Sequence, residues 1–504
     1  MTHRPLVPEG RAANVLLPFD KPCEIKARPF VLAATITASA MAFVDGTVVS
    51  IALPEIQRAL GADIAALQWV VNAYLLILGA LILAGGGLGD RLGRRRLFIV
   101  GIGSFSVASL FCASAPNIET LIAARALQGI GAALLVPQSL AIIAANFPKE
   151  IRGRAIGTWA AASAVTTSLG PPLGGFLIDL ISWRAVFWIN LPLSAIALWL
   201  AWRHVPESRD YAAKGAIDWG GSLAAIVGLG GLIFALSVIS EAGEIPIVTG
   251  AALAVGIVGI VSFYRIEVRA ENPIAPPALF RLRVFTVVNI VTVLLYGALS
   301  GVLFLLPFDL LSRRGFSAAE AGLTLLPLGI IIGLLSRQAG KLADRHGTRV
   351  FLVVGSFTVG VSCVGFSLGI VNYWIGIVLP LMLLGIGMAI VVSPLTTAVM
   401  NAAPDEKAGA ASGVSNAASR LAGVLAVAIF GTTAGLVFGW MSPEEARFGV
   451  MPDIGSQDRD PIEAAFLSAY AVSLIFAAIW AFVAAACAFF LLPNDRPVPQ
   501  KSAP

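Results

Sequence analysis

Two stretches of this sequence repeat one pattern, and each follows a long apolar run. Residues 86–94 read GGLGDRLGR, and residues 340–349 read GKLADRHGTR. Both fit the pattern G-x-L-small-D-R-x-G, in which a carboxylate and a guanidinium stand between glycines. A charged element that recurs after two separate apolar regions indicates an internally duplicated chain.

The surrounding sequence is too apolar for a soluble protein. Of its 504 residues, 58% are hydrophobic and 12% are charged, whereas a soluble domain has about 25% charged residues. This composition excludes an ordinary soluble enzyme, a disordered protein and a nucleic-acid binder, and it indicates an integral membrane protein. Apolar runs bounded by charges, Pro or Gly predict fourteen helices, because backbone in lipid must satisfy its own hydrogen bonds. The predicted spans are 31–53, 67–88, 97–115, 119–142, 155–180, 184–203, 217–240, 246–264, 285–311, 318–336, 349–370, 374–400, 409–437 and 465–492.

The distribution of Lys and Arg orients the chain. Loops on the side of the N-terminal tail hold most of the 34 basic residues, so the positive-inside rule places this side and both termini in the cytoplasm. The tail has no long apolar core, which argues against a cleavable signal peptide. The net charge of +5 is then explained by basic cytoplasmic loops rather than by an acidic partner.

The repeated stretches occupy equivalent places if two six-helix halves flank a two-helix insert. Parallel repeats of this kind are typical of transporters, with a substrate site near the membrane midplane between the halves. We therefore expect an all-α integral membrane protein. Its expected parts are an N-terminal cytoplasmic tail (1–30), a first six-helix half (31–203), two linker helices with flanking loops (204–284), a second six-helix half (285–492) and a C-terminal cytoplasmic tail (493–504).

With these features the chain resembles the major facilitator superfamily, and within it the fourteen-helix drug:proton antiporters of the EmrB/QacA type, over about residues 30–492. The repeated stretch is similar to the superfamily's signature between helices two and three, and the resemblance implies a latch that favours one of two access states. A carboxylate among guanidiniums forms charge-assisted hydrogen bonds, although a topology anchor is the alternative. The expected gating residues are Gly86, Asp90, Arg91, Gly93, Arg94, Arg95, Gly340, Asp344 and Arg345.

Asp45 and Arg125 are ionisable residues deep within predicted spans. Asp45 belongs to residues 44–54, VDGTVVSIALP, which look like the family's first-helix motif except that Ser50 replaces the usual Asn. Ionisable groups inside a membrane are costly and usually functional. Arg125 in the fourth span needs a counter-charge or carbonyl partners at this depth, and the resemblance implies a role in proton coupling. We expect Asp45 and Arg125 to pair and to couple protons to transport; a structural hydrogen bond is the alternative for Asp45.

The fifth span resembles the pattern that is associated with exporters in the superfamily. This pattern has G, eight residues, G, three residues, GP, two residues and GG, and here Thr166 replaces one glycine. Small residues four apart permit close helix approach, and a proline kinks a helix. We expect the segment to seal or hinge a helix interface, with plain tight packing as the alternative. The motif residues are Gly157, Thr166, Gly170, Pro171, Gly174 and Gly175.

Further polar residues are candidate substrate contacts, and two of them depart from the family pattern. Asp309 and Arg420 stand where relatives commonly have Tyr and Gln. A second deep arginine favours an anionic, zwitterionic or neutral substrate over a cationic drug. The structural alternatives are pairing of Asp309 with Arg313 or Arg314, and pairing of Arg420 with Asp309 or Asp45. The candidate substrate-binding residues are Gln128, Asp309, Asn416 and Arg420.

Together these features predict proton-coupled export, by antiport and alternating access, of amphipathic small molecules such as drugs or toxic compounds across the cell (inner) membrane. The alternatives are an exporter of a specific anionic or zwitterionic metabolite or siderophore-like compound, an uptake symporter, and a non-transporting membrane sensor. No nucleotide-binding motif or metal-ligand cluster is evident, so we expect no enzymatic activity, metal or cofactor. The expected partners are the substrate, protons and the bilayer; a periplasmic adaptor protein is left open.

Overall fold

Helices make up the whole of the described structure. The computed structural model describes residues 25–209, 218–242, 247–270, 273, 275–404, 408–443, 446–452 and 456–493, and these ranges contain no strand. Most of the two predicted tails lies outside them. The elements are α1 (Arg28–Leu60), α2 (Ile64–Leu92), α3 (Arg94–Ser114), α4 (Ile118–Asn146), α5 (Lys149–Leu180), α6 (Ala185–Trp188), α7 (Asn190–His204), α8 (Trp219–Ala242), α9 (Ile247–Arg269), α10 (Pro277–Phe280), α11 (Arg283–Pro307), the π-helical turn η1 (Phe308–Arg313), α12 (Ala318–His346), α13 (Thr348–Ser367), the π-helical turn η2 (Trp374–Val378), α14 (Leu379–Ala402), α15 (Ala408–Met441) and α16 (Arg459–Leu491).

Each of the fourteen predicted spans coincides with one helix or with two successive elements. Thirteen of these units in the described residues are long and apolar enough to cross a membrane. The remaining one is α5, whose first turns include Arg152 and Arg154 and whose 32 residues pack along α1 and α12. The membrane-protein fold expected from hydropathy is therefore confirmed, with α5 as a more polar member of the bundle.

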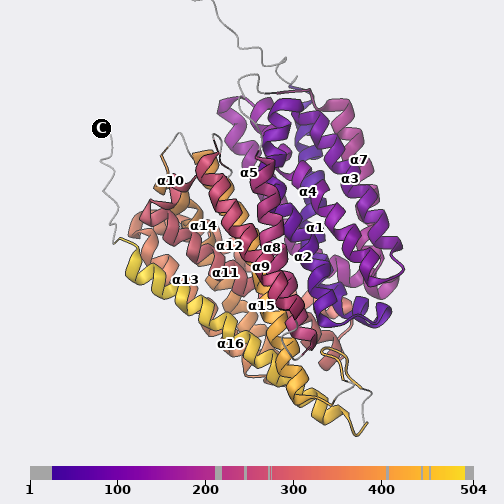
Figure 1. Cartoon of the computed structure of the whole chain (residues 1–504). Coiled ribbons are helices and arrows are strands. Elements are labelled where there is room, and N and C mark those ends of the chain that lie inside the picture. Colours follow the sequence, from indigo (N-terminus) through magenta and orange to yellow (C-terminus); the bar gives the residue numbers. More distant parts are fainter. Residues whose placement is uncertain are drawn as a thin grey trace, which may run out of the picture.

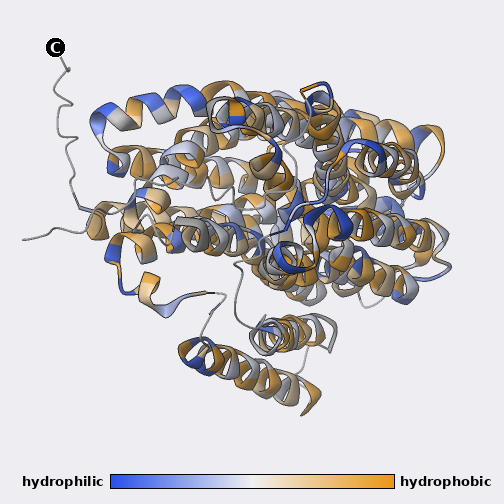
Figure 2. Cartoon of the chain, turned by 90° about the horizontal axis from the view of Figure 1, so that it is seen from above, coloured by the Kyte–Doolittle hydropathy of each residue, from blue (hydrophilic) through white to orange (hydrophobic). Residues whose placement is uncertain are grey.

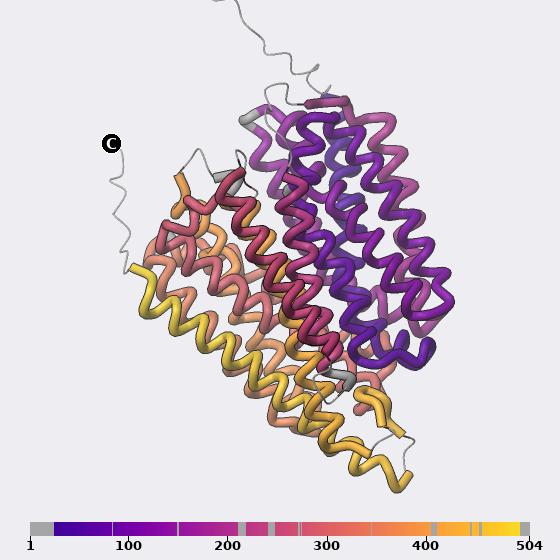
Figure 3. Tube along the Cα trace, in the orientation of Figure 1, coloured from indigo at the N-terminus to yellow at the C-terminus, as the bar shows by residue number. Residues whose placement is uncertain are grey.

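The long helices form two bundles with a helical hairpin beside them. Figure 1 shows α1–α7 together on one side and α11–α16 on the other, and the tube in Figure 3 follows the same path. Since α6 and α7 form one interrupted span, this arrangement is compatible with the predicted two six-helix halves, which stay a prediction. The α8–α9 hairpin packs against α2 and α15, one helix from each bundle, and Figure 2 shows it at the edge of the molecule.

The bundles are joined at one end. We call the end where α1 begins and α16 finishes the terminus side, and the opposite end the far side. Gln57 donates a hydrogen bond to the carbonyl of Phe448 at 2.8 Å, and Arg447 donates to the carbonyl of Gly61 at 2.8 Å. All hydrogen bonds that the described residues form between the bundles lie on the far side. Toward the terminus side the two bundles diverge (Figure 1).

The two repeated stretches have the same local structure. A single glycine separates α2 from α3 and α12 from α13, and these glycines, Gly93 and Gly347, have φ values of +110° and +89°. Residues with a Cβ atom rarely adopt such backbone angles. The glycine that ends each repeat thus lets the chain reverse direction within one residue, which explains why both stretches finish with it.

Candidate functional site

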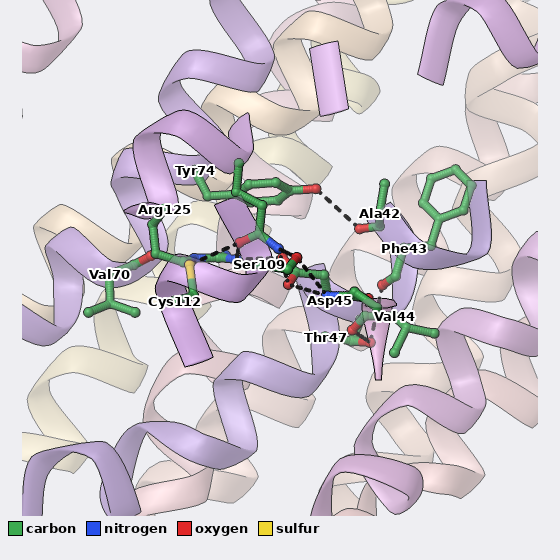
Figure 4. A network of polar contacts seen from close by, with 12 residues as sticks. Ala42, Phe43, Val44, Asp45, Thr47, Val70, Tyr74, Ser109, Cys112 and Arg125 are labelled. Carbon is green, nitrogen blue, oxygen red and sulfur yellow. Dashed lines mark hydrogen bonds and ion pairs between the residues drawn. The ribbon is translucent and has the colours of Figure 1, made fainter. Parts of the chain in front are cut away.

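The centre of the first bundle contains a buried ion pair. Asp45 comes from α1 and Arg125 from α4, and the Nη1 atom of Arg125 lies 2.5 Å from Oδ2 of Asp45 (Figure 4). Gln128, one turn after Arg125, donates to the other carboxylate oxygen at 2.8 Å. Both charged side chains are at most 2% exposed. The contact expected between Asp45 and Arg125 is therefore present, and Gln128 belongs to it.

The guanidinium of Arg125 is satisfied on several sides. Its Nη1 donates to Oε1 of Gln128 at 2.6 Å, and its Nε donates to the carbonyl of Val70 at 3.1 Å. The Cζ atom of Arg125 lies 4.4 Å from the ring centre of Tyr74, which supplies a cation–π contact. Burial of an ion pair is tolerated when hydrogen bonds satisfy the remaining polar atoms. The site meets this condition, so the arginine can stay charged in the membrane interior.

Two further polar residues of the site were missed by sequence reasoning. The hydroxyl of Ser109 in α3 accepts from Gln128 at 2.9 Å and from Asn190 at 3.2 Å, and Asn190 also lies 3.5 Å from Oδ1 of Asp45. Asn190 is the first residue of α7, directly after the interruption of the sixth span. The sequence could have indicated Asn190, because it is a polar residue in an apolar run two residues before Pro192. Ser109 is a single serine in an apolar helix, and nothing in the sequence distinguishes it.

On the terminus side, the first repeated stretch, residues 86–94, forms its polar contacts with residues of the first bundle and the loop that follows it. Asp90 pairs with Arg94, whose Nη2 lies 2.8 Å away. The carboxylate of Glu207 accepts from the backbone amides of Arg95 at 3.1 Å and Arg96 at 3.2 Å, so it caps the start of α3. Glu207 lies in a loop without periodicity and was not predicted. Four of the nine predicted gating residues, Asp90, Gly93, Arg94 and Arg95, thus lie around the start of α3, which is the arrangement expected of a latch but also of an anchor.

The remaining gating candidates are dispersed. Arg91 is half-buried, and Gly86 approaches only Pro137 of α4. In the second stretch, a Cβ atom at Gly340 would lie 2.3 Å from the hydroxyl of Ser393, so α12 and α14 touch closely there. Arg345 is exposed, and the side chain of Asp344 lies outside the described part of the chain.

The small residues of α5 permit close contact with α1. A Cβ atom at Gly170 would lie 2.2 Å from Oγ1 of Thr47, and one at Gly174 would lie 2.4 Å from a methyl group of Val48. Thr166, which replaces the family's glycine, instead turns its hydroxyl to the carbonyl of its own helix one turn back, at 2.6 Å. The predicted small-residue stripe is thus a contact surface at two of its three positions.

The same segment also touches the second bundle. A Cβ atom at Gly175 would lie 2.1 Å from the carbonyl oxygen of Ala318 in α12, and one at Gly322 would lie 2.3 Å from that of Pro171. At the other end of the motif, Gly157 is exposed and has no atom within 4 Å of a Cβ position. Ser168, between Thr166 and Gly170, also lies 2.0 Å from the Cβ position of Gly329 in α12, so the motif meets the second bundle from its middle to its far-side end.

The structure gives Asp309 structural partners. Its carboxylate binds Nε of Arg313, and Nε of Arg314 lies 2.7 Å from its second oxygen. Arg313 is also 3.5 Å from Glu463 of α16. Asp309 itself is 1% exposed. The alternative of pairing with neighbouring arginines is thus the arrangement observed, and a substrate contact of this residue stays only a prediction.

Arg420 has neither of the acidic partners considered from sequence. Asp45 and Asp309 are bound to other arginines, so the expected alternative of an ion pair with Arg420 is wrong. Arg420 forms no ion pair with any described residue. It is half-buried, and its Cβ lies 3.8 Å from the Cβ position of Gly79. Arg420 therefore lies where α15 of the second bundle meets α2 of the first.

Asn416, one turn before Arg420, lines a small polar cavity of about 70 Å³ in the second bundle. Thr292, Tyr296, Ser412 and Ser419 line it as well. The amide of Asn416 donates to the carbonyl of Ser412 at 3.0 Å. Of the four candidate substrate residues, Asn416 alone lies at this cavity, while Gln128 is part of the buried network around Asp45. The structure thus does not bring the four together into one site.

Sequence comparison relates the chain to transporters of drugs and antibiotics. The family model described as Major Facilitator Superfamily matches residues 35–427. The multidrug resistance protein Stp of Mycobacterium tuberculosis is 33% identical over 80% of this chain and 74% of that protein. The tetracenomycin C resistance and export protein of Streptomyces glaucescens is 31% identical over 87% of this chain and 82% of that protein.

Solved structures of similar shape agree with this assignment. A bacterial homologue of the human lysosomal transporter Spinster has a TM-score of 0.66 at 18% identity and covers 94% of this chain and 100% of its own. The xylose transporter XylE of E. coli, in an inward open conformation, has a TM-score of 0.59 at 15% identity, with 93% and 96% covered. At these identities the likeness concerns the fold alone.

Proposed function

The chain belongs to the major facilitator superfamily, and on this premise we propose that it exports amphipathic small molecules in exchange for protons by alternating access. It is a multi-pass membrane protein and a transporter rather than an enzyme. Relatives are named multidrug and antibiotic resistance proteins, which supports a drug exporter. Coupling to protons, the fourteen-helix antiporter type, the residue boundaries of the halves and a place in the inner membrane are parts of the proposal.

The observation that carries proton coupling is the buried pair of Asp45 and Arg125. A proton on Asp45 would remove the only acidic partner that the described residues give this arginine. Loss of one charge from a buried pair costs about 3–5 kcal/mol, because the other charge is left uncompensated. Protonation would therefore loosen the contact between α1 and α4, and it could bias the bundle toward the other access state.

The arrangement of the bundles supports alternating access. If the terminus side faces the cytoplasm, as the basic loops indicate, the bundles are joined outside and diverge inside. This is the state in which an exporter accepts its cargo. In the opposite state the far-side contacts of Gly175 with Ala318 and of Gln57 with Phe448 would have to open. The cluster of Asp90, Arg94 and their neighbours would then close the cytoplasmic side, and a periplasmic adaptor is left open.

Transport by purified protein in liposomes tests the proposal. An imposed pH gradient should accelerate transport of ethidium or carboxyfluorescein by the parent chain, and Asp45→Asn should abolish the acceleration. Asp309→Asn is the matched control, because it also removes the charge of a buried, arginine-paired carboxylate and should keep the gradient dependence. Equal, gradient-independent transport by the parent and Asp45→Asn would refute proton coupling through Asp45.

A second candidate function is export of a specific anionic or zwitterionic metabolite or siderophore-like compound. The observation in its favour is Arg420, a half-buried cation between the bundles without an ion-pair partner among the described residues. Arg420→Gln should then reduce transport of carboxyfluorescein more than that of ethidium. Arg337→Gln, which removes an exposed charge from α12, should leave the ratio unchanged. If Arg420→Gln transports carboxyfluorescein and ethidium in the same ratio as the parent, Arg420 does not contact the substrate.

A further inference from the structure

A cavity lies between the α8–α9 hairpin and the two bundles. Its volume is about 460 Å³, and its walls come from α2, α8, α9, α10, α11 and α15 and from Ala275. We call it the hairpin pocket and define it by Gly79, Ala225, Phe263, Val293 and Ala418. A volume of roughly 300–1,000 Å³ is typical of sites for small organic ligands. The pocket therefore has the size of a binding site rather than of a packing defect.

The pocket lies in the terminus-side half of the helices that line it. Ser222 and Thr286 are within the first turns of α8 and α11, and Leu229 and Leu294 mark its deeper end. At a rise of 1.5 Å per residue, this deeper end is about 15 Å from the helix starts. Since the hydrocarbon core of a bilayer is about 30 Å thick, the pocket lies at the depth of one leaflet.

The walls of the pocket are apolar, and none of its lining residues is charged. Two of the polar side chains are turned to the backbone: Asn289 donates to the carbonyl of Phe285 at 2.9 Å, and Thr286 donates to that of Phe280 at 2.7 Å. Buried oxygens of Asn289 and of Ser222 lack a hydrogen-bond partner in the described structure. Burial of a charge in such surroundings is costly, so the pocket favours an uncharged chain.

The outer wall faces lipid. In the most apolar windows of α8 and α9, only 28% and 22% of the residues are buried. The hairpin therefore exposes most of its surface to the bilayer, and acyl chains surround the pocket at its own depth. An apolar cavity of this size would forfeit the dispersion contacts of its walls if it stayed unfilled, and acyl chains are the apolar molecules that surround it.

We propose that the hairpin pocket binds one acyl chain of a lipid of the terminus-side leaflet. The hydroxyl of Ser222 lies near the interfacial end, where it can donate to the ester carbonyl of a lipid. The inserted hairpin thereby gains a role of its own, since it completes the pocket against one helix of each bundle. This inference does not depend on proton-coupled export.

Photochemical labelling tests the pocket in the intact protein. The chain is reconstituted with a phospholipid that carries a diazirine midway along one acyl chain, irradiated without any gradient, and mapped by mass spectrometry. We expect labels on Ala225, Phe263 and the segment 414–421. Ala225→Phe with Ala418→Phe should reduce them by at least about fivefold, since a packed ring leaves no room for a chain. Ala254→Phe, on the exposed face of α9, is the control and should leave them unchanged.

The results separate the pocket from general lipid contact and identify the source of the chain. Labels confined to exposed positions of α9, or equal labelling of the filled variant, would overturn the proposal. The map of the parent chain decides by itself if the filled variant does not give monodisperse protein. In a second arm, excess ethidium or carboxyfluorescein is added. Unchanged labels assign the pocket to lipid, whereas loss of the labels would show that a transported compound occupies it and would overturn the assignment to lipid.

Discussion

The carboxylate of Asp179, near the far-side end of α5, accepts a hydrogen bond at 2.8 Å from the backbone amide of Ala319 in the first turn of α12. Its other oxygen accepts from the amide of Ala318 at 3.0 Å. First-turn amides have no partner within their own helix, and the helix dipole favours a negative charge there. A residue of the first bundle thus caps a helix of the second, so the contact exists only while the far side is closed.

Removal of this cap should open the far side more often. A helix cap contributes about 0.5–2 kcal/mol, and since 1.4 kcal/mol corresponds to a factor of ten, Asp179→Ala should shift the ratio of closed to open states by roughly two- to thirtyfold. Spin labels at Ala59 and Trp440, both exposed on the far side in different bundles, report this opening by electron-resonance distance measurements. The long-distance population should increase.

Asp63 supplies the matched control for this prediction. It caps α2, its own helix, through the amide of Ala66 at 2.7 Å and lies on the same side of the molecule. Asp63→Ala should lower the thermal stability without changing the distance distribution. If both variants change the distances alike, the effect comes from loss of helix stability, and the contact of Asp179 with α12 does not hold the far side closed.

The glycines of α5 should differ sharply in their tolerance of a methyl group. Gly175→Ala places a carbon 2.1 Å from the carbonyl oxygen of Ala318, and this backbone cannot yield without moving α12. We expect far-side closure to fail and the export rate to decrease by at least about tenfold, the effect of roughly 1.4 kcal/mol. Gly157→Ala meets no atom within 4 Å and should transport like the parent. Similar rates in liposomes for the two variants would refute the sealing role of the motif.

The fold could be predicted from the sequence because the bilayer leaves few choices. A span must satisfy its backbone internally, so hydropathy alone located the helices. The interruption at Ile189 and the π-helical turn from Phe308 to Arg313 could not be predicted in this way. They depend on tertiary partners such as Asp45, which binds Asn190, and on the pairing of Asp309 with Arg313.

The candidate site was predictable in its charges and less so in its neutral groups. An unpaired charge in a membrane is costly, so Asp45 and Arg125 were each expected to have a partner of opposite charge. The ion pair between them gives both residues this partner. Ser109 binds Gln128 and Asn190 of other helices, but most serines of an apolar helix bind only the carbonyl one turn back, so nothing in the sequence marked it. The ion pair considered between Arg420 and Asp45 or Asp309 was wrong, because the sequence does not show which buried carboxylates a guanidinium can reach.

The glycines that end the two repeated stretches provide a last test, in which strain and contact can be separated. Gly93 and Gly347 both have positive φ angles, which cost about 1–3 kcal/mol for other residues. At Gly93 a Cβ atom would in addition lie 2.6 Å from the carboxylate of Glu207, which caps α3. Gly93→Ala should therefore lower the melting temperature more than Gly315→Ala, because Gly315 also has a positive φ, +72°, but no atom within 4 Å of its Cβ position.

Gly103→Ala gives the baseline, since Gly103 lies inside α3 with no atom within 4 Å of its Cβ position. Alanine is favoured over glycine within a helix by about 1 kcal/mol, so this variant should melt no lower than the parent. Thermal unfolding of the purified variants measures the order. If Gly315→Ala melts as low as Gly93→Ala, displacement of Glu207 adds nothing, and backbone strain alone explains the glycine at position 93. If Gly93→Ala also loses export at a temperature where it remains folded, the cap of Glu207 on α3 is part of the latch rather than only an anchor.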